Sequence, residues 1–135
     1  MTQDKELLLK DLCSRIPYGV KMNHIADEEI CPLTLVGVAK DMITLQGAGG
    51  YACTCVEDYK PYLFPLSSMT EEQHNEFFTY FHDVELKEIK TSGDYLKAAY
   101  LGENAKRDWL NKNHFDYRGL IEKGLAIDAT GKGIY

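Results

Sequence analysis

The chain has 135 residues, of which 44% are hydrophobic and 27% charged, and its 15 basic and 21 acidic side chains give a formal net charge of −6. This balance is that of an ordinary globular protein and excludes disordered and fibrous classes. A negative net charge repels a phosphate backbone at long range, so it disfavours non-specific nucleic-acid binding.

The chain carries no targeting signal that we recognise. Its first ten residues lack the basic segment and long apolar stretch of a secretory signal, and no apolar run approaches the roughly 18 residues of a membrane span. We therefore expect one domain over residues 1–135, located in the cytoplasm and not attached to a membrane. In that compartment the four cysteines are expected to be reduced thiols: Cys13, Cys31, Cys53 and Cys55.

Hydrophobic periodicity predicts a helix followed by strands. Leucines at helical spacing lie between Thr2 or Asp4, either of which could cap, and Pro17, which ends the pattern. Short runs rich in β-branched and aromatic residues then predict a meander over 20–22, 33–38, 42–45 and 51–56. Residues 58–66 contain two prolines and predict an extended crossing segment, with an edge strand as the alternative because proline cannot donate to a ladder.

The second half of the chain reads as helical. Thr70 and Gln73 form a capping box, Asp94 can cap a second helix, and a third helical stretch covers residues 103–113. The tail from residue 127 either frays or adds one late strand. The predicted fold class is α+β, with an N-terminal helix, a small antiparallel sheet or partly open barrel of about four to five strands, and C-terminal helices packed on it.

Metal and cofactor signals are weak. Cys53 and Cys55 share one face of a strand and could bind zinc with His24 and Cys31, but the spacing is wrong for a structural zinc site, and buried thiols are commonly small apolar fillers. The glycines of residues 46–50 join two strand-like runs and lack the following helix of a phosphate loop, so they predict a hairpin. We expect no metal and no cofactor.

The densest polar and aromatic cluster runs from Trp109 to Gly119. Tryptophan, tyrosine and arginine dominate many binding surfaces, and a histidine and an aspartate in the cluster could orient one another. The candidate binding residues are Trp109, His114, Asp116, Tyr117 and Arg118. In the alternative interpretation the apolar members lock the C-terminal helices onto the sheet, with Asp116 and Arg118 paired at the rim.

Two stretches, residues 60–72 and 109–126, resemble a family of small uncharacterised proteins encoded in bacterial prophages and mobile elements. Both lie in the second half of the chain. The resemblance implies a phage-type genomic setting and assigns no catalytic residue.

Three functions remain open from sequence. The leading hypothesis is a non-enzymatic accessory protein that binds a protein partner through the aromatic and basic cluster. A small hydrolase or transferase would use His114 with Asp116. A nucleic-acid-binding protein would stack Trp109 or Tyr117 on bases and use the basic side chains of Lys106, Arg107, Lys112, Arg118 and Lys123.

Overall fold

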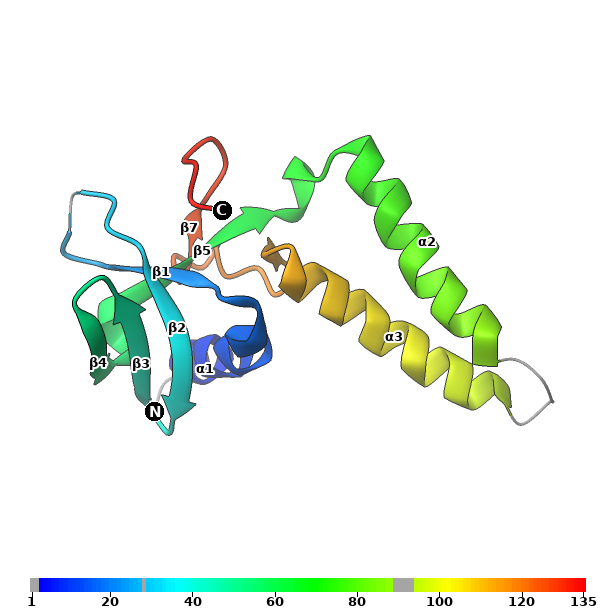
Figure 1. Ribbon diagram of the computed structural model, residues 1–135, viewed down its shortest axis with the longest axis horizontal. Helices are drawn as coiled ribbons and strands as arrows, with labels where there is room; N and C mark the ends of the chain where they lie inside the picture. The colour runs from blue at the N-terminus through cyan, green and yellow to red at the C-terminus, as the bar shows by residue number, and fades with distance from the viewer. Residues whose placement is uncertain (1–2, 28, 89–93) are drawn as a thin grey trace.

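The computed structural model describes residues 3–27, 29–88 and 94–135, with side chains described outside residues 81–100. It confirms the α+β class and the predicted order of one helix, a meander of strands and further helices (Figure 1). The helices are α1 (Gln3–Arg15), α2 (Glu71–Glu88) and α3 (Asp94–Lys112), with 3-10 turns η1 (Ile16–Tyr18), η2 (Val56–Asp58) and η3 (Leu66–Ser68). The strands are β1 (Lys21–His24), β2 (Leu33–Ala39), β3 (Met42–Gly47), β4 (Gly50–Cys55), β5 (Tyr59–Pro65), β6 (Phe115–Asp116) and β7 (Ile127–Asp128).

The sheet is open and mixed. Its strands run in the order β4-β3-β2-β1-β5-β6, and β7 also pairs with β5. The five longer strands are antiparallel, as predicted, and the two-residue strands β6 and β7 add parallel pairs. The glycine run makes the predicted hairpin between β3 and β4, where Gly47 lies opposite Gly50. The sheet therefore extends beyond the predicted meander because the C-terminal segment returns to it.

The predicted edge position of residues 58–66 is wrong. The segment is extended, but β5 pairs with β1, β6 and β7, and both of its edges are occupied, because the Leu63 carbonyl and the Phe64 amide belong to one peptide unit and point to opposite sides. Its prolines are tolerated because other residues make the hydrogen bonds: the Phe64 amide donates to the His114 carbonyl at 2.8 Å, and the Leu63 carbonyl accepts from the Ala129 amide at 2.9 Å. A short parallel pairing thus places a proline-containing strand inside the sheet.

Helices α2 and α3 pack on each other and project away from the sheet (Figure 1). The capping box is confirmed, since the Gln73 amide donates to Thr70 Oγ1 at 3.1 Å and the Thr70 amide donates to Gln73 Oε1 at 2.9 Å. The two predicted helical stretches beginning at Asp94 and at residue 103 are one continuous helix, α3. The C-terminal helices meet the sheet at their root, where α3 contacts β6.

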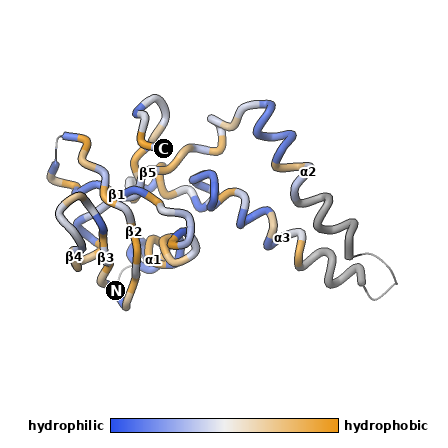
Figure 2. The backbone as a smooth tube through the Cα atoms, viewed as in Figure 1, coloured by the Kyte–Doolittle hydropathy of each residue, from blue (hydrophilic) through white to orange (hydrophobic). Residues whose placement is uncertain are grey.

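The hydrophobic core lies between α1 and the sheet. In Figure 2 hydrophobic colour marks parts of α1 and the strands, while the start of α2 is hydrophilic. Burial of one large aliphatic side chain contributes about 1.5–3 kcal/mol, so this layer supplies most of the driving force for folding. The fully buried members include Leu12, Val20, Met22, Leu35, Ile43, Leu45, Val56, Leu63 and Leu120. Among the described helices, none combines the length and the apolar character needed to cross a bilayer.

Candidate functional site

The predicted site residues lie on one continuous stretch, which runs from the last turns of α3 through β6 into the following turn. Trp109 and Asp116 are buried, at 5% and 7% exposure, whereas His114, Tyr117 and Arg118 are half-buried. The stretch therefore presents much less surface than its composition suggests.

The Trp109 indole is held between aromatic neighbours. Its ring stacks on Phe115 with centroids 5.7 Å apart and planes 7° apart, and it also contacts Phe77 at 5.2 Å. The indole Nε1 donates to Glu76 Oε1 at 3.4 Å. Phe115 is itself buried in β6, so this stack fastens the root of the α2–α3 hairpin to the sheet. The apolar packing is the one that the alternative interpretation predicts.

Asp116 holds the turn that follows β6. Its two carboxylate oxygens accept hydrogen bonds from the backbone amides of Leu120 at 3.0 Å and Ile121 at 2.9 Å. The predicted pairing of Asp116 with Arg118 is therefore wrong, and so is the suggested orientation of His114 by Asp116. Backbone amides compete well for an aspartate in a turn because they are close in sequence and would otherwise lack acceptors.

Arg118 pairs instead with Asp11 on α1, where its Nε donates to Oδ1 at 3.1 Å. The same carboxylate accepts a hydrogen bond from Arg15 Nε at 2.7 Å. Both guanidinium groups lie over the Tyr117 ring, with Cζ 5.3 Å from the ring centroid for Arg15 and 5.0 Å for Arg118. The Tyr117 hydroxyl donates to Asn111 Oδ1 at 2.9 Å. Sequence reasoning missed Asp11 and Arg15, although their helical spacing of four residues was a usable signal.

His114 is neutral in the fold. Its ring stacks on Tyr135, with centroids 3.6 Å apart, and burial together with the charges of Arg15 and Lys21 lowers the pKa of His114 from 6.5 to about 4. The Tyr135 hydroxyl donates to the Tyr62 carbonyl at 2.7 Å and accepts from the Lys21 amide at 2.9 Å. The tail thus adds the late strand β7 and ends on an anchored side chain. A neutral, stacked imidazole is poorly placed for proton transfer near pH 7.

A cavity of about 210 Å³ lies beside Trp109, at the root of the α2–α3 hairpin. We call it the hairpin cavity. It draws residues from η1, α2, α3 and the turn that follows α3, and its lining is Tyr18, Glu76, Tyr80, Asp108, Trp109, Lys112 and Asn113. Of the five predicted site residues, Trp109 lines this cavity, and Asp116 and Tyr117 line a second one of about 290 Å³ against Pro65 and Leu66. His114 lines neither of these two cavities.

The electrostatics of the hairpin cavity favour positive charge. Glu76 and Asp108 place carboxylates at its wall, and Lys112 offsets one of them. Burial raises the pKa of Tyr18, and the Asp108 carboxylate and the Tyr80 phenol add to that rise.

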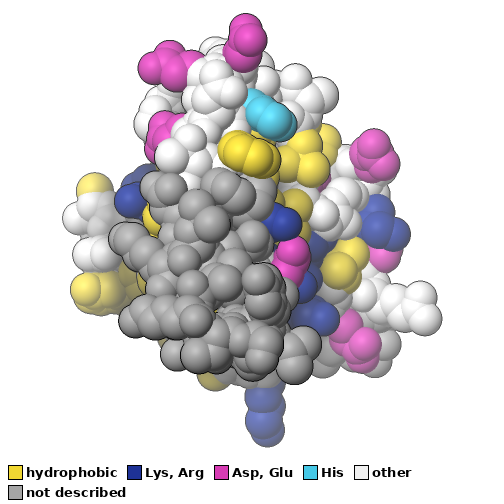
Figure 3. Space-filling view, turned by 90° about the vertical axis from the view of Figure 1, so that its right-hand side faces the viewer, with side chains coloured by type: hydrophobic (Ala, Val, Ile, Leu, Met, Phe, Trp, Pro, Cys, Tyr) yellow, Lys and Arg dark blue, Asp and Glu magenta, His cyan; other side chains and the backbone are white. Residues whose placement is uncertain are grey.

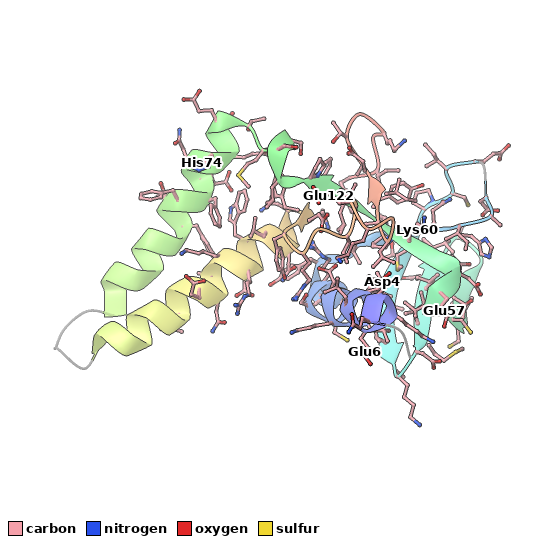
Figure 4. The ribbon with its side chains drawn as sticks, turned by 180° about the vertical axis from the view of Figure 1, so that it is seen from behind. Asp4, Glu6, Glu57, Lys60, His74 and Glu122 are labelled. Atoms are coloured by element: carbon pink, nitrogen blue, oxygen red, sulfur yellow. The ribbon has the colours of Figure 1, made fainter. Side chains whose placement is uncertain are left out.

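On the face that Figure 3 shows, basic and acidic side chains are interspersed among the described residues. Lys106 pairs with Glu103 at 2.9 Å, and Arg118 is committed to Asp11. Other acidic side chains lie at the end of the molecule away from the hairpin, where Figure 4 labels Asp4, Glu6 and Glu57.

All four cysteines are unpaired and exposed, so the prediction that Cys53 and Cys55 fill apolar space is wrong. Cys53 and Cys55 lie on β4, at the edge of the sheet, where Cys53 Sγ is 3.4 Å from Thr44 Oγ1. Among the side chains that the structure describes, no group of three or more histidines, cysteines, aspartates or glutamates is arranged to hold a metal ion. His74, on α2, is exposed (Figure 4).

Comparisons with protein-family models, with curated proteins and with solved structures found no match to this chain. Its functional interpretation therefore depends on the geometry described above.

Proposed function

We propose that this protein is a non-enzymatic binding protein that docks a protein partner at the hairpin cavity. The observation that carries the proposal is the cavity beside Trp109, which has three aromatic residues in its wall. One of these aromatic residues, Tyr80 on α2, is also 46% exposed, so its ring is accessible to a partner. Exposed aromatic side chains around a small pocket are typical of the anchoring points of protein interfaces.

The size of the cavity favours a protein side chain over a free organic ligand. Pockets that enclose drug-sized molecules have volumes of about 300–1,000 Å³. The hairpin cavity, at about 210 Å³, is smaller than that range and is open to solvent at the root of a projecting hairpin. A partner that inserts one side chain here could cover the neighbouring helical surface with the rest of its chain.

The proposed contact surface is the hairpin cavity, which includes Trp109, and it excludes the candidate residues of the 114–118 segment. The Asp116 carboxylate accepts from the amides of Leu120 and Ile121, and the Arg118 guanidinium is paired with Asp11, so both charges are already compensated within the fold. The same contacts weaken the hydrolase alternative, because a histidine with a pKa of about 4 and no orienting carboxylate is a poor general base near pH 7.

We place this function in the cytoplasm and in a phage-type genomic setting, both as parts of the proposal. Four exposed and unpaired thiols are compatible with a reducing compartment. The genomic setting is supported by the resemblance of residues 60–72 and 109–126 alone.

Site-specific photocrosslinking tests the docking surface. The full chain would carry p-benzoylphenylalanine in the change Tyr80→p-benzoylphenylalanine, and Tyr51→p-benzoylphenylalanine is the matched control because Tyr51 is 71% exposed on β4, away from the hairpin. In a lysate of the organism that carries the gene, we expect a discrete crosslinked protein from position 80 that position 51 does not give and that an excess of unmodified chain competes away. Identical products from the two positions would contradict docking at the hairpin cavity.

A further inference from the structure

We infer that the hairpin cavity is a receptor for a cationic side chain, lysine or arginine, presented by the protein partner. This inference rests on the proposed docking function and names the chemistry that the docked residue must have. The cavity combines aromatic rings with carboxylates: Tyr18 and Tyr80 supply ring faces, the small exposed part of the Trp109 indole adds to them, and Glu76 and Asp108 supply the negative charge. A cation over an aromatic face gains about 0.5–1 kcal/mol at exposed sites and about 2 kcal/mol or more when it is desolvated.

The tryptophan of this cage is preorganised. Stacking on Phe115 and contact with Phe77 fix the ring plane, and the Nε1 hydrogen bond to Glu76 fixes its edge. The same hydrogen bond turns the Glu76 carboxylate toward the cavity wall that the indole forms. The Trp109 ring therefore loses little conformational entropy when a ligand binds, which improves affinity without any new contact.

The charged side chains that line the cavity favour a positively charged ligand. Glu76 and Asp108 outnumber Lys112, so the cavity carries a net negative charge that one incoming cation neutralises. An anionic side chain would find Lys112 but would also face both carboxylates, and a neutral one would leave the negative charge uncompensated. The net charge of −6 on the whole chain adds long-range attraction for a basic partner.

The polar groups of the wall suit a nitrogen cation in particular. Carboxylate, phenol and amide oxygens are acceptors, and lysine and arginine offer three and five N–H donors. Asp108 is exposed and Trp109 is buried, and both line the cavity, so a cationic head group could reach the exposed carboxylate while the aliphatic stem of the incoming residue lies against the rings. This arrangement accepts both lysine and arginine.

The chain provides its own reporter, because Trp109 is its single tryptophan. We would follow Trp109 emission during titration of the full chain with N-acetylated, C-amidated pentapeptides of sequence Gly-Gly-Xaa-Gly-Gly, where Xaa is arginine, lysine, glutamine or glutamate. The arginine and lysine peptides should change the emission saturably, with Kd values on the order of millimolar for a single anchored side chain, and should bind more weakly as salt rises. The glutamine and glutamate peptides should give no saturable change.

Matched variants test the carboxylates. Asp108→Asn should weaken the arginine peptide about tenfold, because it removes a charged partner of the cation, whereas Asp4→Asn removes the same charge at the opposite end of the molecule and should leave binding within about twofold. Glu76→Gln and Glu6→Gln form a second pair with the same expectation. Far-UV circular dichroism would establish that each variant is folded before its titration is interpreted.

Several results would overturn the inference. Equal weakening of arginine-peptide binding by Asp108→Asn and Asp4→Asn would show that the net charge of the chain, and not the cavity carboxylate, attracts the peptide. Saturable binding of the glutamate peptide would show that the cavity accepts an anion. Free argininamide that binds as tightly as the arginine peptide would identify a small free cation in place of a protein side chain. If position 80 crosslinks to a partner while no basic peptide alters Trp109 emission, the cation assignment fails and docking stands; if both experiments are negative, docking fails as well.

Discussion

The Asp11 carboxylate on α1 accepts a hydrogen bond of 3.1 Å from the Nε of Arg118, although the two residues are 107 positions apart in the chain. Arg15 donates two hydrogen bonds to the same carboxylate, and its Nη2 also donates to the Phe115 carbonyl at 2.6 Å. Asp11 and Arg15 are fully buried. One carboxylate therefore ties the first helix of the chain to the segment around β6.

Removing that carboxylate should be costly. Asp11→Ala leaves the buried Arg15 guanidinium without its counter-ion and frees Arg118, and breaking a buried ion pair from one side costs about 3–5 kcal/mol. Urea unfolding followed by circular dichroism measures the change in the free energy of unfolding, with Asp4→Ala, an exposed position of the same helix, as the control. A loss below about 1 kcal/mol would contradict a structural role for the cluster.

The stability of the fold should depend on His114 at mildly acidic pH. The pKa of His114 is about 4 in the folded chain and near 6.5 when unfolded, so between these values the unfolded state binds a proton that the folded state does not. The free energy of unfolding should therefore be unaffected by this group above pH 6.5 and should fall as the pH drops from 6.5 toward 4, by at most about 1.4 kcal/mol per pH unit. His114→Gln should flatten this slope, as urea unfolding at several pH values would reveal, whereas His74→Gln at an exposed position should retain it.

The hydroxyl of Tyr135 should stabilise the fold. Tyr135→Phe keeps the ring against His114 but removes the acceptor of the Lys21 amide and the donor to the Tyr62 carbonyl, at a cost of about 1–2 kcal/mol. Thermal unfolding of this variant can be compared with that of Tyr51→Phe, whose hydroxyl is on a side chain of 71% exposure and should be dispensable. Equal melting temperatures for the two variants would show that the anchoring hydrogen bonds contribute nothing net.

Asp116 should act locally, on the turn that it holds. Asp116→Ala removes the acceptor of two backbone amides, and losing a side-chain cap of this kind costs about 0.5–2 kcal/mol. Hydrogen exchange should accelerate at the amides of Leu120 and Ile121, while Asp116→Asn, which keeps one oxygen acceptor, should show a smaller effect. Unchanged exchange at both amides in the alanine variant would contradict the assignment.

Local signals in the sequence predicted much of the fold. The first helix, the hairpin at the glycine run and the Thr70–Gln73 capping box were all predictable because each is decided by residues within a few positions of one another. The periodicity of the strands likewise placed β1 to β4 within a residue or two of their observed bounds.

Long-range choices could not be read in this way. β6 and β7 have two residues each, too few for any periodicity, so nothing indicated that β5 would be flanked on both sides. The partner of Arg118 is Asp11 on the first helix, 107 positions away. The chain has 21 aspartates and glutamates, and nothing in the sequence distinguishes Asp11 from the others as that partner. The hairpin cavity combines η1, α2 and α3, and sequence reasoning found Trp109 in its wall but not Tyr18 or Tyr80, which lack a shared spacing.

The central position of β5 has a consequence for how the chain folds. Its partner β1 precedes it by about forty residues, and its partners β6 and β7 follow it by about fifty or more. The ordering entropy of these long connections must be overcome before the middle of the sheet is complete. Contacts between residues so far apart slow folding relative to chains that form only neighbouring pairs. We therefore expect the β2–β3–β4 meander to form early, and the closing of the sheet around β5 to be the slow kinetic step of this molecule.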